Sequence, residues 1–83
     1  MNIAVCDNDE RCIMKVRQII AQNYPLTCFH SAQELLESYQ AGKRFDLLIL
    51  NVIIGQSSGI TIAKIIRKMD KQVMLVFIAD DET

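Results

Sequence analysis

The sequence predicts an α/β fold in which helices cover both faces of one parallel sheet. Short apolar runs alternate with segments whose apolar residues recur every three or four positions, in the order strand–helix–strand–helix–strand–helix–strand. The third and fourth apolar runs contain no polar residues, which is typical of strands buried on both faces. Right-handed crossovers between such strands place the helices on both faces of the sheet.

The composition fits one compact domain spanning residues 1–83, with 51% hydrophobic and 23% charged residues. The net charge of -1 and the scattered basic residues indicate no direct binding of nucleic acid. No apolar run is long enough to cross a bilayer, so no membrane contact is expected. The cysteines are odd in number and lack metal-site spacing, which predicts small core residues in a cytoplasmic protein: Cys6, Cys12 and Cys28.

The first half of the chain predicts two strands and two helices. Residues 2–6 form an apolar strand that ends in an acidic loop, and a helix follows over residues 10–23. Pro25 prevents that helix from continuing. The inner face of the helix is expected to consist of Ile13, Val16, Ile19 and Ile20.

The second strand is expected at Leu26–Phe29. Ser31 and Glu34 form an S-x-x-E capping box, in which each side chain bonds a backbone N–H of the other residue. The helix that begins there ends near Gly42, a residue suited to a helix C-terminus. Its apolar residues are Leu35, Leu36 and Tyr39.

The second half predicts a strand over residues 47–50 that closes with Asn51, followed by a loop over residues 52–58. Gly55 and Gly59 flank this loop, as glycines do in ordinary turns and in anion-binding loops. Ser57 or Ser58 caps a third helix, which runs to about Met69 with an inner stripe of Ile62, Ile65, Ile66 and Met69. The last strand spans residues 73–79.

Polar residues follow three of these strands, at the carboxyl edge where parallel sheets bind ligands: Asp7, Asn8, Asp9, Asn51 and Asp80. These residues also have ordinary structural interpretations. Asp7 and Asn8 are of types that cap helices. Asn51 can be a strand-end amide that bonds nearby backbone.

Two segments carry a family resemblance: I-A-V-C-D-N-D-E, from Ile3 to Glu10, and F-D-L-L-I-L-N-V-I-I-G-Q-S-S-G-I, from Phe45 to Ile60. In order and spacing they resemble the receiver domains of bacterial response regulators, whose second segment reads D-L-I-L-D-x-x-M-P-x-x-x-G. The opening is most similar to receivers of LytTR-type transcriptional regulators. The resemblance spans all 83 residues and implies a flavodoxin-like (CheY-like) sheet with strand order 2-1-3-4.

The resemblance also implies a degenerate pocket. Asp7 and Asn8 occupy the acidic Mg²⁺-binding positions, and Ile53 occupies the position of a main-chain carbonyl ligand. Asn51 replaces the phosphoryl-accepting aspartate, and Ala79 replaces a Ser or Thr. Because an amide oxygen is a poor nucleophile, phosphorylation is not expected. Mg²⁺ prefers carboxylate oxygens, so only weak metal binding is expected, and no other cofactor.

The chain is therefore expected to be a non-enzymatic pseudo-receiver in transcriptional regulation, contacting a sensor kinase or an output domain. One alternative is a working phosphoacceptor that uses another carboxylate, such as Asp7 or Asp80. A second is a flavodoxin-like cofactor binder, although no glycine-rich loop follows the first strand. A third is a non-functional N-terminal fragment of a longer regulator.

The fifth βα unit of the family, with its phosphate-pairing lysine, is expected to be missing from this chain. The apolar strand over residues 73–79 reads as an interior strand, yet the missing unit would leave it as an exposed edge. Exposed apolar edges recruit other strands. We therefore expect a homodimer that forms through Val73–Ala79.

Overall fold

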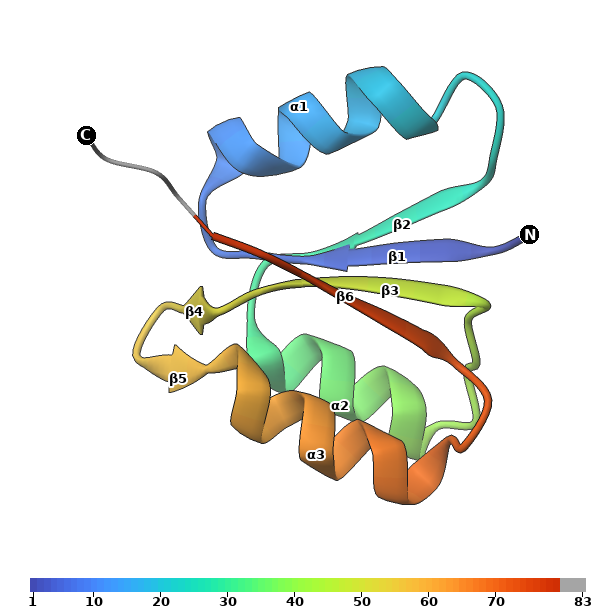
Figure 1. The fold of residues 1–83 in the computed structure, drawn as a ribbon, viewed down its shortest axis with the longest axis vertical. Helices are drawn as coiled ribbons and strands as arrows, with labels where there is room; N and C mark the ends of the chain where they lie inside the picture. Colours follow the sequence, from blue (N-terminus) through green and yellow to red (C-terminus); the bar gives the residue numbers. More distant parts are fainter. Residues whose placement is uncertain (80–83) are drawn as a thin grey trace.

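The computed structural model describes residues 1–79, so Asp80 lies outside the described residues. These residues form three helices and six strands in one domain (Figure 1). The elements are β1 (Ile3–Cys6), α1 (Glu10–Ile20), β2 (Leu26–Phe29), α2 (Ala32–Gln40), β3 (Leu47–Asn51), β4 (Ile53–Ile54), β5 (Ser57–Ser58), α3 (Gly59–Met69) and β6 (Met74–Ile78).

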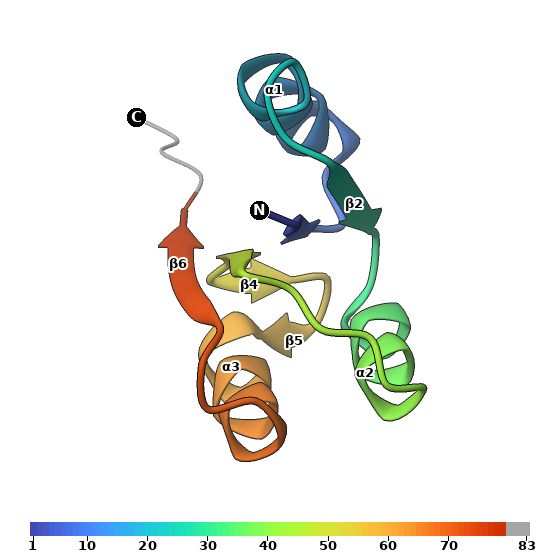
Figure 2. The ribbon, with the colours of Figure 1, turned by 90° about the vertical axis from the view of Figure 1, so that its right-hand side faces the viewer.

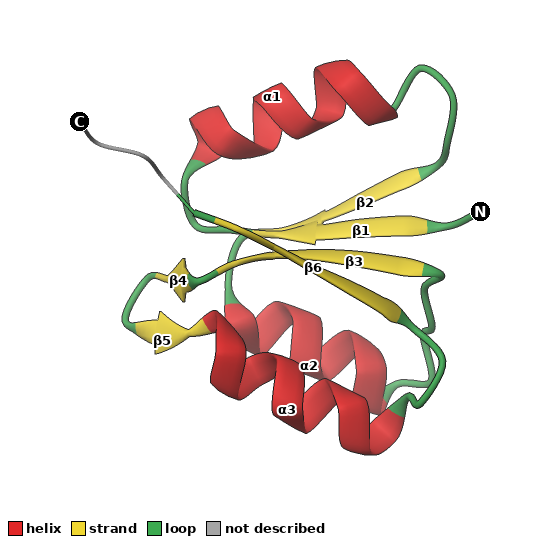
Figure 3. Cartoon of the chain, viewed as in Figure 1, coloured by secondary structure: helices red, strands yellow, loops and turns green. Residues whose placement is uncertain are grey.

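The main sheet has the order β2-β1-β3-β6, and all its strand pairs are parallel. This confirms the predicted flavodoxin-like order 2-1-3-4. Helix α1 covers one face of the sheet, and α2 and α3 lie side by side on the other (Figures 1 and 3). No helix within residues 1–79 is long and apolar enough to cross a membrane.

Each face of the sheet has its own hydrophobic core. The smaller core lies under α1 and contains Ile3, Val5, Ile13 and Ile49. The larger core lies under α2 and α3 and includes Ala4, Cys6, Leu35, Tyr39, Leu48, Leu50, Ile62 and Ile66. Successive residues of β1 thus point into two cores that are both buried. This explains why apolar and polar residues do not alternate along this strand.

The segment predicted as a loop over residues 52–58 contains a small hairpin instead. Strands β4 and β5 pair antiparallel, with Ile54 opposite Ser57. Gly55 takes the first position of the two-residue turn with φ 62°, the left-handed conformation that this turn requires. The buried Ile54 side chain anchors the hairpin to the larger core.

The predicted capping box is half confirmed. The Ser31 hydroxyl accepts a hydrogen bond from the Glu34 N–H at 3.1 Å. The Glu34 carboxylate, however, accepts from the His30 N–H and not from that of Ser31. At α3 the cap is Ser58, whose hydroxyl accepts from the Thr61 N–H.

Two predicted inner residues are exposed. Ile19 is 75% exposed on α1, which ends at Ile20, and Ile65 is 39% exposed on α3. Each helix has one neighbouring layer, so only a stripe about 100° wide is buried. Of the cysteines, Cys6 is buried as predicted, whereas Cys12 and Cys28 are half-buried; none of the three forms a disulfide bond within the described residues.

Candidate functional site at the carboxyl edge of the sheet

Strands β1 and β3 bring the predicted site residues Asp7 and Asn51 together. Cys6 pairs with Leu50 in the register of the two parallel strands, so the next residue of each strand leaves the sheet at the same level. Both side chains are buried, Asp7 at 1% and Asn51 at 2% exposure. Two residues 44 positions apart therefore meet because of the strand register.

A hydrogen bond joins the two side chains directly. Asn51 Nδ2 donates to Asp7 Oδ2 at 2.9 Å. The other Asp7 oxygen accepts from the Asp9 N–H at 3.1 Å, and Asn51 Oδ1 accepts from the Ile53 N–H at 3.0 Å. The polar atoms of the two side chains thus bond within the protein, and no buried side-chain nitrogen or oxygen of the described residues lacks a partner.

Asp9 plays a different part from Asp7. It is the N-cap of α1, and its Oδ1 accepts from the Arg11 N–H at 2.9 Å. Hydrogen bonds from the Arg11 side chain and backbone lower the pKa of this carboxyl below its ordinary value. The helix cap is therefore Asp9, and the capping alternative for Asp7 and Asn8 is wrong.

The other predicted positions lie around this pair without adding charge to it. Asn8 is exposed, and Ile53 belongs to the hairpin with its side chain 64% exposed. Ile78 pairs with Asn51, so Ala79 follows at the same edge and offers only a methyl group.

The side chains present fit Mg²⁺ poorly. The pair has one carboxylate, and both of its oxygens already accept hydrogen bonds. Within residues 1–79, no group of three or more His, Cys, Asp or Glu side chains is placed to hold a metal ion.

Gly59 positions α3 against this site. A Cβ atom on Gly59 would lie 2.0 Å from the Asn51 carbonyl oxygen, so only glycine permits the close approach of the two backbones. The Gly59 N–H also donates to the Val52 carbonyl at 2.8 Å. Sequence reasoning treated Gly59 as a turn or anion-loop residue and missed this packing role, since no local pattern reports a contact with another strand.

Cys6 lies next to the pair in sequence but is chemically inert. Burial, with smaller contributions from the carboxylates of Asp7 and Glu34, raises the pKa of its thiol to about 12. The thiol therefore stays protonated at neutral pH, and its Sγ donates to the Ser31 carbonyl oxygen at 3.4 Å. Cys6 is therefore a poor candidate for a nucleophile.

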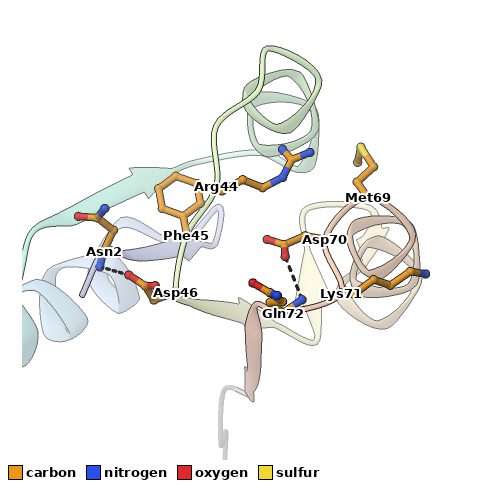
Figure 4. A pocket seen from close by; sticks show the side chains of 8 residues that line it. All are labelled: Asn2, Arg44, Phe45, Asp46, Met69, Asp70, Lys71 and Gln72. Carbon is orange, nitrogen blue, oxygen red and sulfur yellow. Dashed lines mark hydrogen bonds between the residues drawn. The ribbon is translucent and has the colours of Figure 1, made fainter.

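A hollow of about 610 Å³ lies at the opposite, amino edge of the sheet (Figure 4). Its two carboxylates already accept hydrogen bonds from the backbone. Asp46 accepts from the Asn2 N–H at 2.6 Å, and Asp70 accepts from the Gln72 N–H at 3.0 Å. The lining residues are Asn2, Arg44, Phe45, Asp46, Met69, Asp70, Lys71 and Gln72.

Asp70 also receives a hydrogen bond from the buried Tyr39 hydroxyl at 3.0 Å. Burial by itself would raise the pKa of Asp70, but the bonds from Gln72, Tyr39 and Val73 outweigh it and lower that pKa. The sequence did not reveal this cluster, because its members lie 31 positions apart and have no shared motif.

Comparison with known proteins identifies one family that matches nearly the whole chain. The family model of the response regulator receiver domain matches residues 3–83. A search of curated proteins finds no match.

Solved structures share the fold at low sequence identity. Response regulator DrrB, an OmpR/PhoB homologue from Thermotoga maritima, superposes with a TM-score of 0.85 at 21% identity, over 99% of this chain and 36% of that one. The N-terminal domain of a response regulator/sensory box/GGDEF protein from Carboxydothermus hydrogenoformans superposes with a TM-score of 0.90 at 15% identity. The match covers 100% of this chain and 67% of that one. The non-phosphorylated HemR receiver domain from Leptospira biflexa superposes with a TM-score of 0.83 at 22% identity. The match covers 94% of this chain and 63% of that one.

The chain thus spans between 36% and 67% of the length of these three structures. The family match over residues 3–83 covers all four strands of the main sheet. The chain therefore belongs to the response regulator receiver domain family, the signalling domains of two-component systems.

Proposed function

We propose that this receiver domain signals through protein contacts and does not accept a phosphoryl group at residue 51. The observation that supports the proposal is the hydrogen bond from Asn51 Nδ2 to Asp7 Oδ2. Phosphoryl transfer to a receiver needs a carboxylate oxygen as the nucleophile and a divalent cation that offsets the developing charge. Here an uncharged amide occupies the nucleophile position, and its N–H group occupies the side of Asp7 that a cation would need.

The same geometry supports a minor role for Mg²⁺. A cation bound by Asp7, Asn8 and the Ile53 carbonyl would have to displace the amide of Asn51 from the only carboxylate of the pair. We therefore propose that Mg²⁺ binds weakly and is not required for the signalling state. No step of the proposed function depends on it.

The partners we propose are a sensor kinase or an output domain, with a cytoplasmic role in transcriptional regulation. Receiver domains are signalling domains that act on such partners. Related structures include a three-domain response regulator and an adenylate cyclase, which is compatible with a receiver placed beside different outputs. We also propose self-association through residues 73–79. The alternatives are a working phosphoacceptor that uses another carboxylate, such as Asp7 or Asp80, and a non-functional fragment of a longer regulator.

Incubation with a small phosphoryl donor and Mg²⁺, followed by intact-mass measurement, tests the proposal. The chain should keep its unmodified mass, whereas the Asn51→Asp variant should gain a phosphoryl group if the remainder of the pocket is functional. A stable adduct on the unaltered chain would contradict the proposal. An adduct lost in Asp7→Asn but kept in Asn51→Ala would place the nucleophile on Asp7.

A further inference from the structure

We infer that the hollow at the amino edge of the sheet binds a small organic anion, whose carboxylate or phosphate group is held by the guanidinium of Arg44. The hollow lies at the opposite edge from Asp7 and Asn51. Binding there does not depend on whether the carboxyl edge accepts a phosphoryl group, so this site holds or fails independently of the proposed function.

Three parts of the chain form the hollow. They are residue 2 just before β1, the α2–β3 connection, and the end of α3 with its connection to β6. Figure 2 looks onto the edge of the sheet where these parts lie. None of the residues of β6, Met74–Ile78, lines the hollow, so the free edge of that strand takes no part in it. The volume of about 610 Å³ falls within the range of small-molecule pockets, roughly 300–1,000 Å³.

The protein itself holds Arg44 in place. Its Nη1 donates to the carbonyl oxygens of Tyr39 and Lys43, at 3.0 and 2.6 Å, and its guanidinium lies 4.9 Å from the centroid of the Tyr39 ring. No residue of the described chain accepts from its Nε or Nη2. These two nitrogens form one edge of the planar guanidinium, and such an edge binds two oxygens of a carboxylate or phosphate at once. Arg44 is therefore an anion-binding group that is already oriented.

The two carboxylates of the lining are engaged by the protein. Asp70 is 9% exposed, and both of its oxygens accept hydrogen bonds from within the fold. Asp46 accepts from the Asn2 N–H at 2.6 Å through one oxygen. The other Asp46 oxygen repels an anion. Figure 4 shows Asp46 at the left of the hollow and the side chains of Arg44 and Lys71 to its right, so we expect the anion on their side.

The donors of the lining, in contrast, are available to a ligand. Arg44 and Lys71 form no salt bridge with any residue among 1–79. The side-chain amides of Asn2 and Gln72 likewise make no hydrogen bond within this part of the chain. Two positive charges and two amide groups thus remain where the negative charges are already offset. Such a lining suits a ligand with negative charge and oxygen acceptors.

Phe45 and Met69 give the hollow an apolar wall. Both side chains are half-buried, and the Phe45 ring packs edge-on against Phe29 with the ring centroids 5.9 Å apart. Inorganic phosphate would fill a small part of the hollow and leave this wall in water. An anion with an apolar or aromatic body removes the wall from water as well, which favours binding. The expected ligand is therefore an organic carboxylate or phosphate.

Titration of the 83-residue chain with phenyl phosphate, followed through the backbone amides by NMR, tests the site. The signals of residues 44–46 and 69–72 should shift saturably, with a dissociation constant of about 1 mM or lower. Inorganic phosphate lacks the apolar body and phenol lacks the charge, so each should bind at least about tenfold more weakly. Benzoate should shift the same signals, and the tighter of the two anions identifies the preferred group. Shifts confined to residues 7–9 and 51–54, or no saturable shift, would overturn the inference.

A matched pair of variants separates Arg44 from the general charge of this edge. Arg44→Gln should weaken the binding of phenyl phosphate by about tenfold or more, because a hydrogen-bonded charge is lost. Lys43→Gln removes the same charge from the neighbouring residue, which does not line the hollow, and should change the affinity by less than about twofold. Equal losses in the two variants would show nonspecific attraction and contradict the site.

Arg44→Lys tests the geometry of the guanidinium. Lysine keeps the charge but has no planar pair of donors, so this variant should bind nearly as weakly as Arg44→Gln. Phenyl phosphate should raise the urea midpoint of the unaltered chain and have little effect on that of Arg44→Lys. Full affinity in Arg44→Lys would refute the two-point contact. Because Arg44 also bonds the end of α2, the NMR mapping on the unaltered chain decides the question if these variants fail to fold.

Discussion

Replacing Asn51 by Asp changes the site by one functional group. An oxygen takes the place of the nitrogen that now lies 2.9 Å from Asp7 Oδ2, with both side chains at most 2% exposed. The change removes a hydrogen bond to a charged group, which contributes about 1.5–3 kcal/mol. It also sets two carboxylates against each other, with a Coulomb repulsion of roughly 5 kcal/mol at an effective dielectric constant of 20.

The pair will relax by sharing a proton, as close carboxylates do. We therefore expect the free energy of unfolding to fall by about 3 kcal/mol at pH 7 without divalent cations, a large part of the stability of a small domain. The shared proton raises the pKa of the pair above the ordinary carboxyl range. The loss of stability in Asn51→Asp should thus be complete above the raised pKa. It should shrink as the pH falls toward about 4, because the carboxyls of the unfolded chain then bind protons as well.

Urea unfolding followed by circular dichroism, at pH 7 and pH 5, with EDTA or with Mg²⁺, measures these effects. A loss of 3 kcal/mol lowers the urea midpoint by about 2–3 M for a domain of this size. Mg²⁺ should recover part of the stability of Asn51→Asp, because two carboxylates can then bind it. The control Asn51→Ala removes the donor without adding charge and should not respond to Mg²⁺. If Asn51→Asp were as stable as the unaltered chain at pH 7 in EDTA, the role given to the amide would be wrong.

Three further predictions concern the packing around the sheet. Gly59→Ala should cost about 3 kcal/mol in the same assay, because its Cβ meets the Asn51 carbonyl; an unchanged midpoint would show that the backbones separate freely. Tyr39→Phe removes the hydroxyl that Asp70 accepts from and should cost about 2 kcal/mol at pH 7. Since the folded pKa of Asp70 lies below its ordinary 3.8, its contribution is complete above about pH 5 and is lost as the pH falls through the lowered pKa. The difference in stability between the two proteins should therefore shrink only as the pH falls below 3.8, and a constant difference down to acid unfolding would exclude the ionised acceptor. Ser31→Ala should cost about 1 kcal/mol by removing the α2 cap, with Ser31→Asp as the variant that restores it.

Much of the fold could be predicted because its signals are local. Strand and helix order, the breaks near Pro25 and Gly42 and the strand-end position of Asn51 follow from residue type and spacing alone. The β4–β5 hairpin escaped prediction because two-residue strands are too short to show periodicity. Ile19 and Ile65 were misplaced because periodicity identifies an apolar face without showing how wide the neighbouring layer is.

The candidate site divides in the same way. Asp7 and Asn51 were predicted at one sheet edge, since parallel strands end together. The hydrogen bond between them, the close approach of Gly59 and the Tyr39–Asp70 contact could not be predicted, because each joins segments far apart in the chain.

By itself, the sequence determined that residue 51 carries a neutral amide, which is a poor nucleophile, because nucleophilicity belongs to the chemical group. Only the tertiary structure decided where that amide points: its N–H meets the buried carboxylate of Asp7, and its oxygen accepts from the hairpin. The reason is that side-chain contacts across a sheet depend on strand register and burial, which no local pattern of residues contains.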